Sequence, residues 1–144
     1  MILLLMLLIS MVTSEKAIQI DAGSSGSRLY IYEYEERVFN TLPPPVTQIY
    51  GKETWSRKVT PGLHTFSTIK QSADSIESLL KIVQKHVITT ETRVFLGATA
   101  GMRLIPDKSE EILDEIYKRI INLGFICKRK WIEVLAAEEE GAYG

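Results

Sequence analysis

A glycine- and serine-rich segment between two β-patterned runs is the feature that most constrains the fold of this chain. Residues 17–20 alternate loosely before Asp21, and residues 29–34 alternate aliphatic with aromatic side chains. An alternation with a period of two residues is typical of a strand with one buried face. The segment between the two runs contains two glycines and three serines. The sequence therefore predicts a β-hairpin whose tip exposes several backbone N–H groups.

The pattern after the hairpin predicts a mixed α/β domain. Residues 46–50 and 55–59 are expected to continue the antiparallel sheet, after a proline-rich loop at residues 40–45 that cannot pair in a ladder. Further along the chain, apolar residues recur at helical spacing in two segments, which predicts two helices. A short apolar run between the helices and another after them predict two more strands. The expected elements are a helix at residues 72–86, a strand at 92–98, a helix with its apolar stripe at 112–121 and a strand at 131–135.

Two residues predict where the second helix begins and ends. Asp107, followed three residues later by Glu110, is expected to start it, and Gly124 is expected to stop it. The predicted order is thus three strands, helix, strand, helix, strand.

Composition and charge exclude some classes of partner. The chain has 144 residues, which suits one domain, and its formal net charge is -1. One short basic run, at residues 128–130, is expected to cap a strand edge in solvent. A near-neutral chain gives no long-range attraction to nucleic acid.

The single cysteine, Cys127, is interpreted as a small buried apolar residue, the alternative being a thiol whose disulfide partner lies elsewhere.

The first residues of the chain predict a secretory leader. Residues 2–12 are almost continuously apolar, but a bilayer span needs about 20 residues. The run fits the apolar part of a signal peptide, with cleavage after Ser14. A buried strand or part of a membrane anchor are the alternatives. We expect mass spectrometry of the secreted protein to find an amino terminus near Glu15. A mature, membrane-embedded chain that begins at Met1 would contradict this prediction.

The hairpin tip carries residues suited to binding phosphate. Gly23 and Gly26 are expected to take positive φ and to turn successive N–H groups inward. The hydroxyls of Ser24, Ser25 and Ser27 add donors, and Asp21 can hold a hydrated divalent cation. Arg28 is expected to pair with a carboxylate near the loop. The alternative is an ordinary hairpin loop, in which glycine and serine are common.

Two later segments also end strands with polar groups. Thr99 follows a buried strand and lies between two alanines, so a ligand or a metal-bound water can approach its hydroxyl, while Arg103 could reach a phosphate or an acidic side chain. The second segment is Glu138, Glu139 and Glu140, where a carboxylate before Gly141 could accept a proton from an attacking water. Each segment has a structural alternative. The small residues around Thr99 also suit the packing of a strand-to-helix turn, and the glutamates also suit the start of a helix.

The three segments together resemble the first three signature regions of the apyrases, the nucleoside triphosphate diphosphohydrolases. The resemblance covers residues 17–144 and rests on Asp-Ala-Gly-Ser-Ser-Gly-Ser-Arg, Leu-Gly-Ala-Thr-Ala-Gly-Met-Arg-Leu and Glu-Glu-Gly-Ala-Tyr-Gly in this order, with Pro61-Gly62-Leu63 before the first helix. It implies an actin-like, ribonuclease-H-like architecture in which residues 15–144 form most of the first lobe. Residues 1–14 would be the signal peptide.

The resemblance also implies a reaction and roles for residues. The reaction is hydrolysis of the terminal phosphate of nucleoside tri- or diphosphates with Ca²⁺ or Mg²⁺, in the secretory-pathway lumen, at the cell surface or outside the cell. By position, Glu140 would be the general base, and a one-residue shift of the turn would give that role to Glu139. Asp21 and Thr99 would hold the metal through its waters. Phosphate would lie on Gly23, Ser24, Ser25, Gly26 and Ser27.

Some features of the family pattern do not occur in this sequence. Ala137 stands where the family usually has glycine, and the family's second phosphate loop, of the type Asp-x-Gly-Gly, is absent. We therefore expect residues 1–144 alone to be an incomplete, inactive N-terminal part. An exopolyphosphatase of the same fold and a truncated, non-catalytic nucleotide-binding module remain as alternative functions.

Overall fold

The computed structural model describes residues 14–35, 46–48 and 56–136. The predicted leader, the proline-rich loop and the glutamate cluster lie outside these ranges. One mixed sheet of six strands runs in the order β3-β2-β1-β5-β6, with β4 also paired to β2. The strands are β1 (Ser14–Ala22), β2 (Ser27–Glu35), β3 (Val46–Gln48), β4 (Ser56–Val59), β5 (Thr92–Ala98) and β6 (Ile132–Val134). None of the helices in the described ranges has the length and hydrophobicity needed to cross a bilayer.

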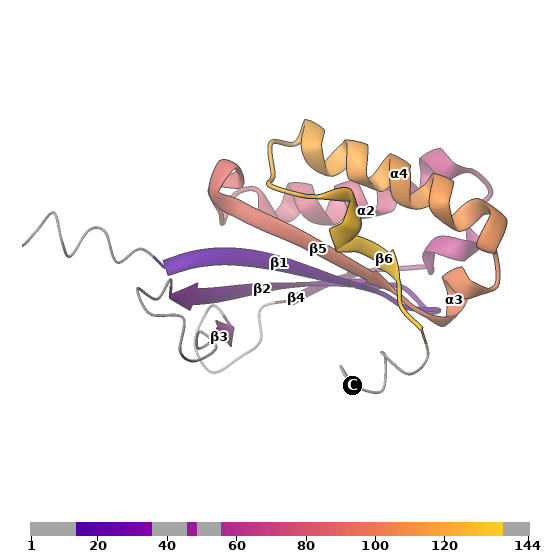
Figure 1. The fold of residues 1–144 in the computed structure, drawn as a ribbon, viewed down its shortest axis with the longest axis horizontal. Coiled ribbons are helices and arrows are strands. Elements are labelled where there is room, and N and C mark those ends of the chain that lie inside the picture. The colour runs from indigo at the N-terminus through magenta and orange to yellow at the C-terminus, as the bar shows by residue number, and fades with distance from the viewer. Residues whose placement is uncertain (1–13, 36–45, 49–55, 137–144) are drawn as a thin grey trace, which may run out of the picture.

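Two long helices, α2 (Ile69–Val83) and α4 (Pro106–Asn122), lie on the same face of the sheet (Figure 1). The short helix α3 (Ala100–Arg103) follows β5, close to the tip of the β1–β2 hairpin (Figure 1). The remaining helical turns are η1 (Leu63–Thr65), η2 (Thr89–Glu91) and η3 (Arg129–Trp131).

The predicted hairpin is confirmed, and it lies in the middle of the sheet. β1 pairs with β2 in antiparallel register from Ser14↔Glu35 to Ala22↔Ser27. On its other side β1 pairs in parallel with β5, and β5 pairs in parallel with β6. Because the carboxyl ends of β1, β5 and β6 therefore meet at one edge, the loops that follow these strands are brought together.

The beginning of the fold has four strands where three were expected. β3 pairs with β2 at Tyr32–Tyr34, and β4 pairs with β2 at Ser27–Tyr30. β3 and β4 thus occupy one position in the sheet, along the same edge of β2. The predicted order of elements therefore has one strand too few before the first long helix, because two short strands share one edge of β2.

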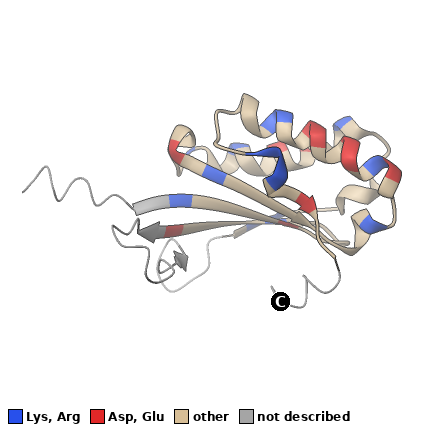
Figure 2. Cartoon of the chain, viewed as in Figure 1, with Lys and Arg blue, Asp and Glu red and all other residues tan. Residues whose placement is uncertain are grey.

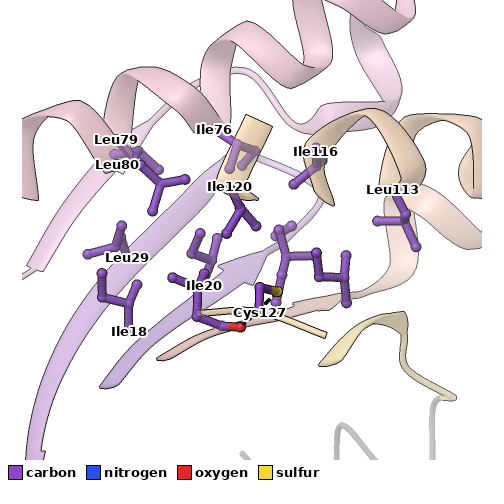
Figure 3. Close-up of a cluster of buried hydrophobic side chains, with 14 of the residues drawn as sticks. Ile18, Ile20, Leu29, Ile76, Leu79, Leu80, Leu113, Ile116, Ile120 and Cys127 are labelled. Carbon is purple, nitrogen blue, oxygen red and sulfur yellow. Dashed lines mark hydrogen bonds between the residues drawn. The ribbon is translucent and has the colours of Figure 1, made fainter. Parts of the chain in front are cut away.

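The core lies between the sheet and the two long helices (Figure 3). Ile18 and Ile20 of β1 are fully buried and alternate with more exposed neighbours, as the strand period predicts. The helical stripes supply the opposing layer, with Ile76 and Leu80 from α2 and Ile116 from α4. The two residues of β1 lie about 55–100 residues before those of the helices along the chain, so the core forms only when helices and sheet associate.

The first helix begins three residues earlier than expected. It begins after Thr68, whose hydroxyl accepts a hydrogen bond from the Gln71 N–H at 3.1 Å, while the Gln71 side chain accepts one from the Thr68 N–H at 3.3 Å. This reciprocal pair is a capping box. The last residue of the helix is Val83, and Gln84 is its C-cap, so the helix also ends three residues before the expected position 86.

The second helix also begins earlier than expected. Pro106 occupies its first turn and Ile105 is its N-cap, without a side-chain cap, so Asp107 lies inside the first turn. Proline fits the first helical position because the N–H that it lacks would have no intrahelical partner there. The predicted stop is confirmed, since Gly124 follows the helix with φ 89°.

Ion pairs join the two helices on their outer surfaces. Arg119 of α4 donates to Asp74 and Glu77 of α2, both at 2.6 Å, and its side chain is only 18% exposed. The basic run at residues 128–130 is not simply solvated, because Arg129 pairs with Glu110 and Asp114 of α4, both at 2.7 Å. Acidic and basic residues are interspersed along the two long helices (Figure 2).

Cys127 is buried, in agreement with its interpretation as a small apolar residue. Its Sγ lies 3.3 Å from the Val94 carbonyl oxygen, and burial raises the pKa of the thiol to about 11. The folded state therefore keeps the proton at pH values where the unfolded chain, with a pKa near 9.0, loses it.

We predict that the free energy of unfolding falls as the pH rises from about 9 towards 11, and that Cys127→Ala removes this part of the pH dependence. Urea denaturation at several pH values measures the effect. At pH 7 the native thiol should also react much more slowly with a thiol reagent than the thiol of the urea-unfolded chain. Equal labelling rates in the two states would contradict the burial of Cys127.

Candidate functional site: the β1–β2 loop and the turns around it

The loop between β1 and β2 presents free donors at the carboxyl edge of the parallel strands. The Gly23 N–H donates to the Gly26 carbonyl oxygen at 2.9 Å and closes the loop. The N–H groups of Ser24, Ser25 and Gly26 have no backbone acceptor within the described part of the chain. Ser24 and Ser25 are exposed. Consecutive free N–H groups beside hydroxyls form a surface that an anion can occupy.

The glycines of this loop have a different role from the one that the sequence predicted. Among the described glycines, positive φ occurs at Gly124 and not at Gly23 or Gly26. Gly26 is instead required by a close approach, because a Cβ added there would lie 2.5 Å from the Val59 carbonyl oxygen and 3.0 Å from Lys58 Cε. The expectation of positive φ was therefore wrong, and the absence of a side chain at Gly26 lets β4 pack against the loop.

The turn that follows β4 supports the loop from the other side. The Thr60–Pro61 peptide bond is cis, and Gly62 is buried beneath the loop. A Cβ added at Gly62 would overlap the carbonyl oxygen of Ser24, and it would lie 2.9 Å from that of Gly23. In the sequence, Pro61-Gly62-Leu63 was noted only as part of the resemblance to the apyrases. The local sequence pattern could not predict its contact with the β1–β2 loop, because some 35 residues separate the loop from this turn.

Thr99 lies beside the loop. Its N–H donates to the Ala22 carbonyl oxygen at 3.0 Å, and its hydroxyl lies 3.4 Å from the same oxygen. A Cβ built on Gly23 would lie 3.9 Å from Thr99 Oγ1. The first two segments predicted from the sequence are thus brought together by the parallel pairing of β1 with β5.

Asp21 is the exposed penultimate residue of β1 and lies opposite Gly97 of β5 and Arg28 of β2 in the sheet register. It makes no ion pair with any described residue, and the predicted pairing of Arg28 with a carboxylate was wrong, because Arg28 Nη1 donates to Ser56 Oγ at 3.3 Å. The Asp21 carboxylate is therefore available to a cation.

Two of the described oxygens could contact a hydrated metal ion at this edge of the sheet. The described residues contain no group of three or more acidic, histidine or cysteine side chains that could surround an ion. Asp21 and the Thr99 hydroxyl supply two oxygens, which suits an ion such as Mg²⁺ that retains several of its waters.

Two buried polar atoms near the loop have unused hydrogen-bonding capacity. Ser27 Oγ is fully buried at the start of β2, and His64 Nδ1 is buried in η1; neither has a partner among the described residues. A Cβ added at Gly101 of α3 would overlap the His64 ring. Ser27 is thus placed at the base of the loop, while Ser24 and Ser25 present their side chains at its surface. His64 was not found from the sequence, because a single histidine carries no pattern.

The chain is held close to Thr99 as it approaches the predicted base. The Leu135 N–H donates to the Ala98 carbonyl oxygen at 2.8 Å, and Arg103 Nη1 donates to the Leu135 carbonyl oxygen at 2.7 Å. Arg103 therefore contacts a main-chain carbonyl, and its suggested contact with a phosphate or an acidic side chain stays a prediction. Glu138, Glu139 and Glu140 lie outside the described residues, but the chain that leads to them is fixed at the same edge of the sheet.

Comparison with known proteins agrees with this arrangement. The family model described as GDA1/CD39 (nucleoside phosphatase) matches residues 10–144. The nucleoside-diphosphatase uda-1 of Caenorhabditis elegans is 36% identical over 138 residues, which cover 88% of this chain and 27% of the relative. The apyrase of Solanum tuberosum is 32% identical over 142 residues, which cover 94% of this chain and 30% of the relative. The chain thus spans less than a third of these curated relatives.

Solved structures agree on the fold. A nucleoside triphosphate hydrolase from Neospora caninum superimposes with a TM-score of 0.64 at 16% identity, covering 98% of this chain and 33% of the other. The PPX-GPPA enzyme of Aquifex aeolicus gives a TM-score of 0.54 at 20% identity, covering 91% of this chain and 39% of the other. The fold is the actin-like, ribonuclease-H-like first lobe that the resemblance implied. With the family match over residues 10–144, these findings establish that the chain belongs to the GDA1/CD39 family of nucleoside phosphatases.

Proposed function

We propose that the protein containing this chain hydrolyses the terminal phosphate of nucleoside di- or triphosphates. The observation that carries the proposal is the loop at residues 23–26, where three consecutive N–H groups and two exposed hydroxyls have no acceptor in the described structure. Such a loop binds phosphate by geometry and partial charge. Membership of the GDA1/CD39 family supports a nucleotide as the bearer of that phosphate.

In this proposal the loop orients the substrate. Ser24, Ser25 and Gly26 hold the phosphate oxygens through N–H groups and hydroxyls, Gly23 closes the loop through its N–H, and Ser27 supports the loop from below. Holding the phosphoryl group in one orientation is a main part of catalysing its transfer, because the reaction depends on positioning and charge stabilisation.

The proposed base is Glu140. A water attacks the terminal phosphorus in line with the bond to the leaving oxygen, and the Glu140 carboxylate accepts the proton of that water. The bond between phosphorus and the bridging oxygen breaks, and that oxygen stays with the nucleotide. The products are inorganic phosphate and a nucleotide shortened by one phosphate. The anchoring of Leu135 beside Ala98 supports a position for the following segment near the loop.

Asp21 and Thr99 are the proposed contacts of a hydrated Ca²⁺ or Mg²⁺ ion. The free carboxylate of Asp21 and the position of Thr99 beside Gly23 support this assignment. When bound, the ion would reduce the negative charge of the phosphate oxygens. The apolar run at residues 2–12 supports synthesis into the secretory pathway, and hence a lumenal, cell-surface or extracellular location.

The test is phosphate release by the full-length protein from ATP, ADP and UDP, with and without EDTA, and from inorganic polyphosphate. Metal-dependent release from at least one nucleotide supports the proposal. Release from polyphosphate alone would replace it by an exopolyphosphatase, and nucleotide binding without turnover would replace it by a binding module. Residues 1–144 alone should show no turnover, because charge stabilisation is needed on both sides of the transferred group.

A further inference from the structure

A lysine outside the three signature segments lies against the loop. Lys58 is an exposed residue of β4, and its Nζ is 3.5 Å from Ser25 Oγ. Its Cε lies 3.0 Å from where a Cβ of Gly26 would be, so the side chain passes directly over the loop. We propose that Lys58 binds the phosphate of the substrate at the Ser25 end of the loop. This inference rests on the proposed function, and it adds a residue that the signature segments do not contain.

The position of Lys58 is set by the sheet. β4 pairs with β2 so that Lys58 is opposite Arg28 and Val59 is opposite Ser27. The close approach of the Val59 carbonyl to Gly26 fixes β4 against the loop. Lys58 therefore reaches Ser25 from a strand, and a rigid strand positions a side chain better than a loop does.

The charges around Lys58 leave its ammonium group available. It forms no ion pair with a described residue, and its only described polar contact is the one with Ser25. Arg28, its cross-strand neighbour, contacts Ser56 and supplies a second positive charge nearby. Neither cation forms an ion pair with a described residue, although Asp21 lies opposite Arg28 in the register of β1 and β2. Two such cations next to free N–H groups favour an anion with more than one negative charge.

Lys58 and Thr99 lie on opposite sides of the loop. Thr99 is near Gly23, whereas Lys58 is near Ser25 and Gly26. Because Lys58 lies at the Ser25 end of the loop and Thr99 at the Gly23 end, we expect Lys58 to stabilise the bound substrate and the transition state equally. Loss of such an interaction raises KM and leaves kcat nearly unchanged.

The experiment compares three variants of the full-length protein in nucleoside diphosphate hydrolysis. For Lys58→Ala we expect KM to rise about tenfold while kcat stays within about twofold. Lys58→Arg should restore most of the affinity, because it keeps the charge. The matched control is Lys118→Ala, which removes an exposed lysine from α4, and it should leave both constants unchanged. Calorimetry then measures the affinity of the wild type and of Lys58→Ala for ADP and for adenosine. We expect Lys58→Ala to weaken the binding of ADP and to leave the binding of adenosine unchanged.

The outcomes separate this inference from the proposed function. An active wild type whose KM and ADP affinity are unaffected by Lys58→Ala overturns the role of Lys58 and leaves the function standing. A wild type that binds ADP without hydrolysing it overturns the function, while weaker ADP binding by Lys58→Ala still supports the inference. A wild type that neither binds nor hydrolyses nucleotides overturns both. Equal weakening for ADP and adenosine would show a contact with the nucleoside and overturn the phosphate contact.

Discussion

Replacing Glu140 by glutamine in the full-length protein should lower kcat by about 10²–10⁴-fold, the usual contribution of a well-placed general base. Glutamine keeps the shape of the side chain but cannot accept the proton of the attacking water. Glu140 directly precedes Gly141, and a residue without a side chain leaves room for water against the carboxylate. Nucleotide affinity should change little, because the proposed phosphate contacts are on the β1–β2 loop and not on Glu140. Steady-state kinetics and calorimetry of nucleotide binding measure the two effects.

Two further variants distinguish the base from its neighbours. Glu138→Gln should retain nearly full kcat, since Glu138 lies two residues earlier in the segment. Asp21→Ala should raise the metal concentration needed for half activity, because it removes the exposed carboxylate near the end of β1 and does not remove the proposed proton acceptor. Full activity in Glu140→Gln would disprove the assignment of the base.

The second large effect is expected for Gly62→Ala, which should lower the free energy of unfolding by about 1–3 kcal/mol. The backbone of Gly62 has φ -63° and ψ 154°, which alanine adopts without strain, so the effect is purely steric. The added methyl group would overlap the Ser24 carbonyl oxygen. Relief of that overlap must displace either the turn after β4 or the loop itself, so KM for nucleotides should rise as well. Urea denaturation and steady-state kinetics measure the two consequences.

Gly23→Ala is the matched control for stability. A Cβ at Gly23 would lie 3.4 Å from the Gly26 carbonyl oxygen and 3.9 Å from Thr99 Oγ1, which are ordinary contacts. Its free energy of unfolding should therefore stay within about 0.5 kcal/mol of the wild type. If Gly62→Ala proved as stable as Gly23→Ala, the close packing of the turn under the loop would be wrong.

The local elements of the fold were predictable because each depends on neighbours in the sequence. The alternation at residues 17–20 and 29–34 and the apolar stripes of α2 and α4 record which face of each element is buried. The helix boundaries were less predictable. Several residue types can begin a helix, and the capping box of Thr68 and the proline at position 106 decided between them.

The candidate site shows where the sequence stops being informative. The order of the three segments was sufficient to indicate a phosphate loop and the family, since each segment carries its chemistry in a few adjacent residues. Contacts between distant segments have no such local signal. Gly26 and Gly62 were therefore explained only when β4 and its turn were seen against the loop, and Arg103 only when its partner proved to be the Leu135 carbonyl.

The sequence by itself determined the strands, the two long helices, the polar segments that end the parallel strands and the family. The tertiary structure alone decided that β4 and the turn after it lie against the β1–β2 loop, bringing Lys58 to Ser25 and Gly62 beneath Ser24. The physical reason is that periodicity records burial within one element, whereas the approach of two elements depends on strand register and on the volume of each side chain between them.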